Sequence, residues 1–136
     1  MVQLAREEAG GSLTGRRITV WGAAFKPGTD DVRDSPALAV AEALHRAGAV
    51  VTVTDPRALN GARKVLPHLR HLDDPVEAAA GAELLLHLTE WPEYARLDPA
   101  ALAPHLTVPR VIDGRHTLDP VRWRAAGWRY RALGRP

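Results

Sequence analysis

The order of apolar segments along the chain predicts an α/β fold. Strand-like apolar runs alternate with helix-like segments from Arg17 onward, which is typical of a parallel sheet with crossover helices. Residues 83–88 are apolar almost throughout, as a strand covered on both faces requires. The 136 residues have the size of one domain. We therefore expect a Rossmann-like three-layer sandwich with a mainly parallel sheet of about five to six strands.

Turn-forming residues divide these runs into elements. Ser35 and Pro36 predict a helix with a serine cap and a proline in its first turn, and Gly48 marks its end. Asp73 or Asp74 is expected to cap a later helix. The expected strands are 17–21, 50–53, 69–72, 83–88, 108–112 and 128–132. The expected helices and helical turns are 36–47, 58–66, 76–80, 92–97, 98–103 and 119–126.

The composition excludes several kinds of chemistry. The chain contains no cysteine, so a disulfide, a thiolate metal site or a cysteine nucleophile within it is excluded. Its six histidines show no paired ligand spacing, which argues against a metal site. Residues 1–15 lack the apolar core of a signal peptide, and no apolar run reaches the about 18 residues of a membrane helix. We therefore expect a cytoplasmic protein with no membrane partner.

The net charge of +2 conceals an uneven distribution. Residues 110–136 contain seven arginines and two aspartates, a local surplus of five positive charges. Such a surplus could suit a phosphate ligand, an acidic partner or nucleic acid. Nucleic acid is the weaker interpretation, because the arginines alternate with apolar residues at strand and helix spacing and no nucleic-acid-binding motif accompanies them. We therefore expect no nucleic-acid partner.

A polar, charge-dense loop at residues 22–36 lies between the first strand and the capped helix. It carries Lys26 and Arg33 together with Gly28 and three aspartates. Ligands of open α/β sheets bind outside the carboxyl ends of the strands, so both cations are placed to meet an anion. The loop has neither the Gly-x-Gly-x-x-Gly fingerprint nor a Walker-type Gly-Lys-Ser/Thr sequence. It is therefore not expected to cradle a pyrophosphate in the usual Rossmann manner.

A second candidate anion contact is Arg115, in the sequence Asp113-Gly114-Arg115 after the strand at 108–112. This turn should lie at the same edge of the sheet as Lys26. The planar guanidinium pairs well with phosphate or carboxylate, whereas the alternative is a glycine turn with an exposed arginine. Asp55 also ends a strand, and we interpret it mainly as a turn former.

Other side chains near this edge are expected to be structural. His87 lies within a strand and is interpreted as a core or half-buried residue, while His116 could touch a ligand or face water. The four tryptophans are expected to pack in the core, although Trp91 is near enough to the sheet edge to line a cleft. Ser35 is a helix cap rather than a nucleophile, because no nucleophile-elbow motif surrounds it.

The loop also carries a longer pattern, Gly-x-Ala-Phe-Lys-Pro-x-Thr-Asp-Asp-x-Arg-x-Ser-Pro. This pattern resembles the signature that opens the C-terminal domain of the UDP-glucose/GDP-mannose dehydrogenases. The similarity continues through residues 48–49, 55–56, 89–91, 111–115, 126–130 and 133–135. It covers residues 15–136, and residues 1–14 resemble the end of the family's preceding central helix or a linker.

The resemblance implies that the chemistry lies mostly outside this chain. Family members oxidise the C6 alcohol of a nucleotide sugar to a carboxylate by successive hydride transfers to NAD. NAD is bound mainly by an N-terminal domain, and the catalytic cysteine also precedes this segment. The implied partners are therefore a nucleotide sugar and the N-terminal and central domains of the same enzyme, which is a homo-oligomer at full length. The chain alone is expected to be inactive.

The resemblance also assigns residue roles. Phe25, Lys26 and Arg115 are expected to bind the nucleotide sugar, and Arg33 is expected to reach the pyrophosphate of NAD. UDP-glucose is favoured over GDP-mannose because the loop looks most like the UDP-glucose branch of the family. The alternative is a free-standing nucleotide-binding or regulatory module without dehydrogenase activity.

Overall fold

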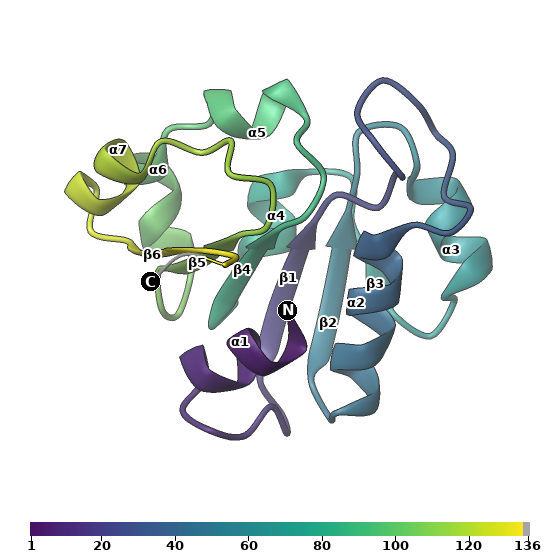
Figure 1. Ribbon diagram of the computed structural model, residues 1–136, viewed down its shortest axis with the longest axis horizontal. Helices are drawn as coiled ribbons and strands as arrows, with labels where there is room; N and C mark the ends of the chain where they lie inside the picture. The colour runs from purple at the N-terminus through teal and green to yellow at the C-terminus, as the bar shows by residue number, and fades with distance from the viewer. Residues whose placement is uncertain (135–136) are drawn as a thin grey trace.

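The computed structural model describes residues 1–134, and within them six parallel strands form one sheet in the order β3-β2-β1-β4-β5-β6 (Figure 1). Every neighbouring pair of strands is parallel. The strands are β1 (Arg17–Trp21), β2 (Val50–Thr54), β3 (Arg70–His71), β4 (Leu84–His87), β5 (Arg110–Asp113) and β6 (Arg129–Ala132). The expected α/β class and strand number are confirmed, and the sheet is wholly rather than mainly parallel.

Helices cover both faces of the sheet. They are α1 (Val2–Glu8), α2 (Pro36–Arg46), α3 (Leu59–Val65), α4 (Pro75–Ala79), α5 (Pro92–Arg96), α6 (Pro99–Leu102), the 3₁₀ turn η1 (Ala103–His105) and α7 (Pro120–Ala125). The helices α1, α2 and α3 lie on one face, and α4 to α7 lie on the other, as right-handed crossovers require. No helix in this described part of the chain has the length and apolar composition needed to cross a membrane.

The helix α2 follows the capping pattern of its sequence. The Ser35 hydroxyl accepts a hydrogen bond from the Leu38 amide at 3.2 Å, and Pro36 occupies the first turn. Leu38, Ala41 and Leu44 are buried against the sheet at helical spacing. Gly48 then adopts a φ of +100°, a left-handed conformation that ends the helix at low cost for glycine.

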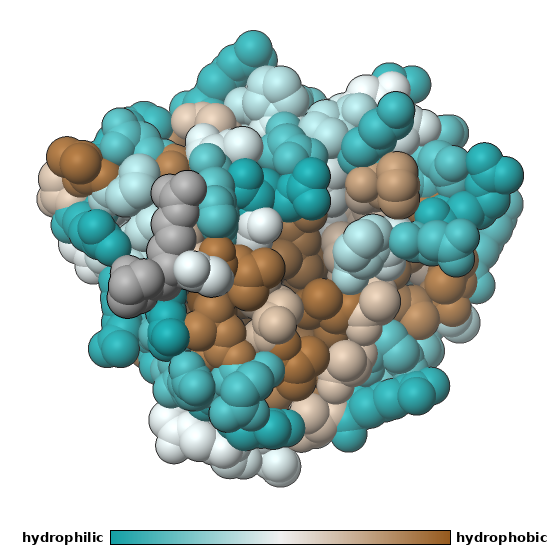
Figure 2. All heavy atoms as spheres, viewed as in Figure 1, coloured by the Kyte–Doolittle hydropathy of each residue, from teal (hydrophilic) through white to brown (hydrophobic). Residues whose placement is uncertain are grey.

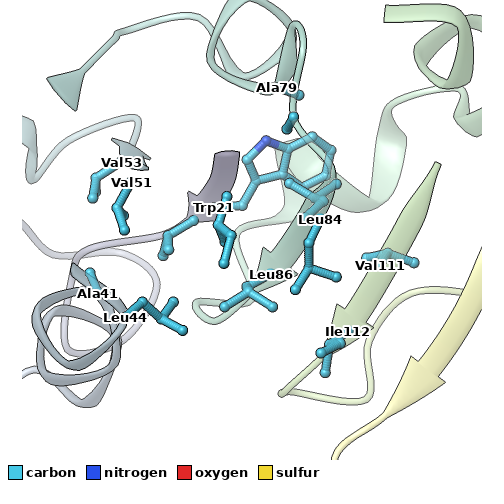
Figure 3. Packing of buried hydrophobic residues seen from close by; sticks show 14 of the residues in the cluster. Trp21, Ala41, Leu44, Val51, Val53, Ala79, Leu84, Leu86, Val111 and Ile112 are labelled. Carbon is cyan, nitrogen blue, oxygen red and sulfur yellow. The ribbon is translucent and has the colours of Figure 1, made fainter. Parts of the chain in front are cut away.

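Aromatic side chains fill the opposite face, around Trp21 at the end of β1. The Trp21 ring stacks on Tyr94 with a centroid distance of 4.8 Å and meets Trp123 edge-on at 6.2 Å. Its indole N–H donates to the carbonyl of Pro75 at 3.2 Å. Figure 3 shows the Trp21 ring beside Ala79 of α4, on the side of the sheet opposite to Ala41 and Leu44 of α2. The prediction that the tryptophans pack in the core is confirmed for all four, since Trp91 and Trp128 are buried too.

A buried carboxylate attaches the helix α1 to β6, the edge strand of the sheet. The Glu8 side chain is 3% exposed and pairs with the guanidinium groups of Arg129 at 2.8 Å and Arg131 at 3.2 Å. The Arg110 guanidinium donates to the carbonyl of Glu8. Ala5 is fully buried on the same helix. Residues 2–8 are therefore helical, as the sequence suggested, and they pack on the sheet.

His87, on β4, is a fully buried imidazole that is held in the neutral form. Its Nε2 lies 2.8 Å from the hydroxyl of Thr117, and its Nδ1 is buried without a hydrogen-bond partner among residues 1–134. Burial lowers the pKa of His87 from 6.5 to about 4, although the nearby carboxylates of Asp113 and Glu90 act in the opposite direction. Because the unfolded chain then binds this proton more tightly, neutral His87 favours the folded state above pH 6.5.

We expect the free energy of unfolding to fall as the pH falls from 6.5 to about 4. The contribution of His87 to this loss is about 3 kcal/mol, at about 1.4 kcal/mol for each unit of pKa difference. Urea denaturation at neutral pH and near the lowered pKa, for wild type and His87→Gln, measures it. The variant should show a shallower pH dependence, and the exposed His105→Gln serves as the control. Identical pH slopes for wild type and His87→Gln would contradict this account.

Candidate functional site

The charged loops lie at the carboxyl edge of the sheet. They leave strands on either side of the point where the strand order reverses. The chain runs outward from β1 to β2 and β3, then returns to place β4 on the other side of β1. In open α/β sheets this reversal opens a crevice at the carboxyl ends of the strands, where ligands bind. The loop of residues 22–36 leaves β1 at this edge, as Figure 1 shows, and the turn with Arg115 leaves β5 there.

Close packing at Gly22 fixes the first step of the loop. Gly22 has a φ of +109°, and a Cβ atom there would lie 2.4 Å from the Cβ of Thr89. Only glycine fits this approach of the loop to the segment after β4. The Thr89 hydroxyl donates to the carbonyl of Ala24 at 3.0 Å, which joins the two segments. The base of the loop is therefore held against the neighbouring strand.

Asp55, at the end of β2, organises the base of the same loop. Its carboxylate is 3% exposed and accepts five hydrogen bonds of 2.7 to 3.0 Å. The donors are the amides of Ala23, Ala24, Arg57 and Ala58 and the indole N–H of Trp91. Asp55 is thus a turn former, as the sequence indicated. It is also an anchor for three separate segments, which the sequence analysis missed.

Phe25 and Lys26 lie at the open part of the loop. Phe25 is 50% exposed, and its amide donates to the carbonyl of Asp31 at 2.8 Å, which closes the loop across its middle. The Lys26 side chain is exposed, and its ammonium forms no hydrogen bond or ion pair within the described part of the chain. The loop therefore presents an aromatic ring and a free cation side by side.

Arg33 is paired within its own loop. Its Nε donates to one carboxylate oxygen of Asp31 at 3.1 Å, and its Nη2 donates to the other at 3.0 Å. These hydrogen bonds hold the pKa of Asp31 below its usual value. The Arg33 side chain is 87% exposed, so the pair is a surface ion pair of small net stability. An incoming anion can therefore compete for this guanidinium.

Asp113 shapes the turn that carries Arg115. Its carboxylate is fully buried and accepts from the amides of Arg115, His116 and Leu118 and from the hydroxyl of Tyr130, at 2.8 to 3.0 Å. The Arg115 side chain leaves this turn and donates its Nε–H to Glu90 Oε2 at 2.6 Å. His116 is exposed, as one of the two alternatives for it required, and its Nε2 lies 2.6 Å from the carbonyl oxygen of Leu133.

A mostly apolar cavity of about 140 Å³ adjoins Arg115. Its lining comes from the start of α2, the segments after β4 and β5, and the two ends of the described chain: Met1, Pro36, Ala37, Val40, Leu88, Gly114, Arg115 and Leu133. Figure 2 shows hydrophobic side chains gathered at the centre of this face, around the N-terminus that Figure 1 marks. The cavity brings Arg115 to the first turn of α2, and neither Lys26 nor Arg33 lines it.

The structure thus brings the predicted residues to one edge without joining them directly. Within residues 1–134 no hydrogen bond or ion pair links Lys26 or Arg33 to Arg115. The same residues contain no group of three histidine, aspartate or glutamate side chains that could hold a metal ion. Trp91 does not line a cleft, because it is 5% exposed and its indole N–H is used by Asp55. Arg135, part of the similar C-terminal segment, lies outside the described residues.

A parallel sheet with cationic loops at its switch point defines an α/β domain of the nucleotide-binding class. The chain belongs to the UDP-glucose/GDP-mannose dehydrogenase family, because the sequence model of that family's UDP binding domain matches residues 19–120. The chain is 44% identical over 128 residues to the UDP-glucose 6-dehydrogenase of Rhizobium meliloti, a match that covers 94% of this chain and 29% of the relative. The chain therefore spans less than a third of the length of this relative.

Solved structures agree with this assignment. A UDP-glucose dehydrogenase from Pyrobaculum islandicum superposes with a TM-score of 0.79 at 36% identity, over 98% of this chain and 28% of that one. An NDP-N-acetyl-D-galactosaminuronic acid dehydrogenase from Methanosarcina mazei gives a TM-score of 0.82 at 26% identity, with the same coverage of both chains. The fold and the family expected from the sequence are confirmed, and the chain spans less than a third of the length of both solved chains.

We expect Asp55→Asn to lower the free energy of unfolding by about 2 to 4 kcal/mol, because buried donors lose a charged acceptor. The amides of Ala23 and Ala24 should lose protection from hydrogen exchange as well. Urea denaturation and amide exchange measure the two effects.

Asp30→Asn is the matched control for this substitution. Asp30 lies in the same loop, is exposed and accepts no side-chain hydrogen bond within the described residues. It should change the free energy of unfolding by less than about 0.5 kcal/mol. Equal stabilities of the Asp55 and Asp30 variants would refute the anchoring role of Asp55.

Proposed function

We propose that this chain is the nucleotide-sugar-binding C-terminal domain of an NAD-dependent UDP-glucose 6-dehydrogenase-like enzyme, which converts UDP-glucose to UDP-glucuronate. The observation that carries the proposal is the pair of cationic loops, with Lys26 and Arg115, on the two sides of the switch point in a domain of this family. A diphosphate bridging these loops would meet a free ammonium from one side and a guanidinium from the other. The 44% identity to a UDP-glucose 6-dehydrogenase supports the choice of UDP-glucose over GDP-mannose.

The surroundings of Phe25, Lys26 and Arg115 suit these side chains to different parts of a nucleotide sugar. Phe25 offers a half-exposed ring beside Lys26, so the two can cover an apolar and an anionic part of one ligand. Arg115 keeps both Nη atoms without partners among the described residues, and these form the fork that binds phosphate bidentately. We assign all three residues to the nucleotide sugar.

Arg33 is assigned to the pyrophosphate of NAD. NAD accepts the hydride that leaves the sugar carbon, and this chain has no glycine fingerprint with which to cradle the cofactor itself. A highly exposed guanidinium on a loop fits a contact to a cofactor held mainly by another domain. Asp31 would share the guanidinium with the incoming phosphate.

The partners in this proposal are the N-terminal and central domains of the same enzyme, in a homo-oligomer. The presence of further domains is supported by the length of the Rhizobium meliloti relative, of which this chain covers 29%. Residues 1–14, which include α1, would then be the end of the connection from those domains. The hydrophobic surface around Met1 lies beside the start of this segment, where the other domains would cover it. An upstream reading frame without a glycine fingerprint or a catalytic cysteine would instead favour the free-standing module.

Calorimetric titration of the chain with UDP-glucose, UDP and GDP-mannose tests the ligand assignment. Lys26→Ala and Arg115→Ala should each weaken binding of the UDP ligands by about ten- to a hundredfold, because each removes a charge-assisted phosphate contact of about 1.5 to 3 kcal/mol. UDP-glucose should bind more tightly than GDP-mannose.

The chain offers matched controls for both variants. Lys64, on α3, is the only other lysine, and Arg70 is exposed on β3 without a side-chain partner among residues 1–134. Lys64→Ala and Arg70→Ala should leave the dissociation constants unchanged. Equal losses in the control variants, or no loss in Lys26→Ala and Arg115→Ala, would exclude the assigned site.

The isolated chain should produce no NADH from NAD and UDP-glucose. The oxidation to the carboxylate level needs a nucleophile that this cysteine-free chain does not supply. Absorbance of NADH over a long incubation, with a full-length family dehydrogenase as the positive control, measures turnover. Clear NADH formation by this chain would show that the chemistry is not confined to the other domains.

A further inference from the structure

The segment Thr89-Glu90-Trp91, which follows β4, lies between the two candidate loops and touches both of them. On one side, Thr89 donates to the carbonyl of Ala24 and the Trp91 indole donates to Asp55, so the segment is attached to the base of the Lys26 loop. On the other side, Glu90 accepts from Arg115. Since β4 lies between β1 and β5 in the sheet, this segment sets the spacing between the loops.

The contact between Glu90 and Arg115 uses one edge of the guanidinium. Arg115 Nε lies 2.6 Å from Glu90 Oε2, and the side chains are 43% and 25% exposed, respectively. Neither Nη1 nor Nη2 of Arg115 donates to any acceptor within residues 1–134. Glu90 therefore restrains the orientation of the side chain while the outer fork stays open.

We propose that Glu90 is a positioning residue, which holds the Arg115 guanidinium with its Nη1–Nη2 edge toward the diphosphate of the ligand. The proposal rests on the proposed function and extends it to a residue that makes no ligand contact itself. A free arginine side chain loses much of its rotamer freedom on binding, and a tether removes part of that loss beforehand. Two attachments of the segment, from Thr89 to Ala24 and from Trp91 to Asp55, give the tether a fixed base.

The carboxylate of Glu90 also opposes binding, because it places a negative charge beside an anionic ligand. Two variants distinguish the positioning effect of Glu90 from its electrostatic effect. Glu90→Gln keeps an oxygen that can accept from Nε–H and removes the charge. Glu90→Ala removes both. A positioning role therefore predicts that the two variants differ, whereas a purely electrostatic role predicts that they bind the ligand equally.

Calorimetric titration with UDP is the first measurement. Glu90→Gln should bind UDP at least as tightly as wild type, and Glu90→Ala should bind about five- to tenfold more weakly than Glu90→Gln, in line with the rotamer freedom released. In the Arg115→Ala background the two Glu90 variants should bind UDP equally, because the residue acts through Arg115. Unchanged ¹⁵N–¹H spectra outside the site show that each variant is folded.

The ¹⁵N resonance of the Arg115 side chain in the ligand-free chain is the second measurement. Its Nε–H should exchange slowly with water in wild type and Glu90→Gln and quickly in Glu90→Ala. Fast exchange in wild type would overturn the positioning role, and so would equal UDP affinities of Glu90→Gln and Glu90→Ala. In either case, UDP binding by wild type leaves the proposed function standing. A protected Nε–H in a wild-type chain that binds no UDP would instead overturn the proposed function, and the role of Glu90 in ligand binding with it.

Discussion

The candidate site depends on two buried carboxylates at the carboxyl edge of the sheet, Asp55 and Asp113. A buried carboxylate is costly unless donors surround it, and here five donors meet Asp55 and four meet Asp113. Most of these donors are backbone N–H groups of the loops themselves, so satisfying the charge dictates the path of each loop. The loops are therefore fixed at their bases, while Lys26 and Arg115 extend from them toward solvent.

The cationic side chains differ in whether an acidic side chain pairs with them. This difference distinguishes structural cations from candidate ligand contacts, which the net charge does not. At the edge strand β6, Arg129 and Arg131 pair with Glu8, whose burial makes that pairing structural, and Arg131 also pairs with Glu7. At the carboxyl edge, Lys26 has no partner among the described residues, and Arg115 uses one edge of its guanidinium. Arg33 shares an exposed pair with Asp31, which is worth little in water. The carboxyl edge therefore leaves cationic side chains available beside the crevice that the fold opens there.

Sequence signals that act over a few residues made part of the fold predictable. The cap at Ser35, the glycine at 48 and the apolar run of β4 act over a few residues, and their elements formed within one or two residues of the expected bounds. The roles of Asp55 and Glu90 could not be predicted this way. The donors of Asp55 come from three segments, and Glu90 lies 25 residues from Arg115 in the chain. Such contacts exist only after the parallel strands align their carboxyl ends, and neither periodicity nor turn chemistry contains that register.

The hydrophobic surface beside Arg115 has a physical role in the proposed enzyme. A charge pair 4 Å apart is worth about 1 kcal/mol in bulk water and about 4 kcal/mol at an effective dielectric constant of 20. The exposed cations of this chain lie between these limits, because water reaches the loops. A second domain that covers the apolar cavity next to Arg115 would exclude water and move the contacts of Lys26 and Arg115 with a diphosphate toward the second limit. In the proposed enzyme, the loops would supply recognition, and closure of the cleft over the hydrophobic surface would strengthen their contacts with the diphosphate.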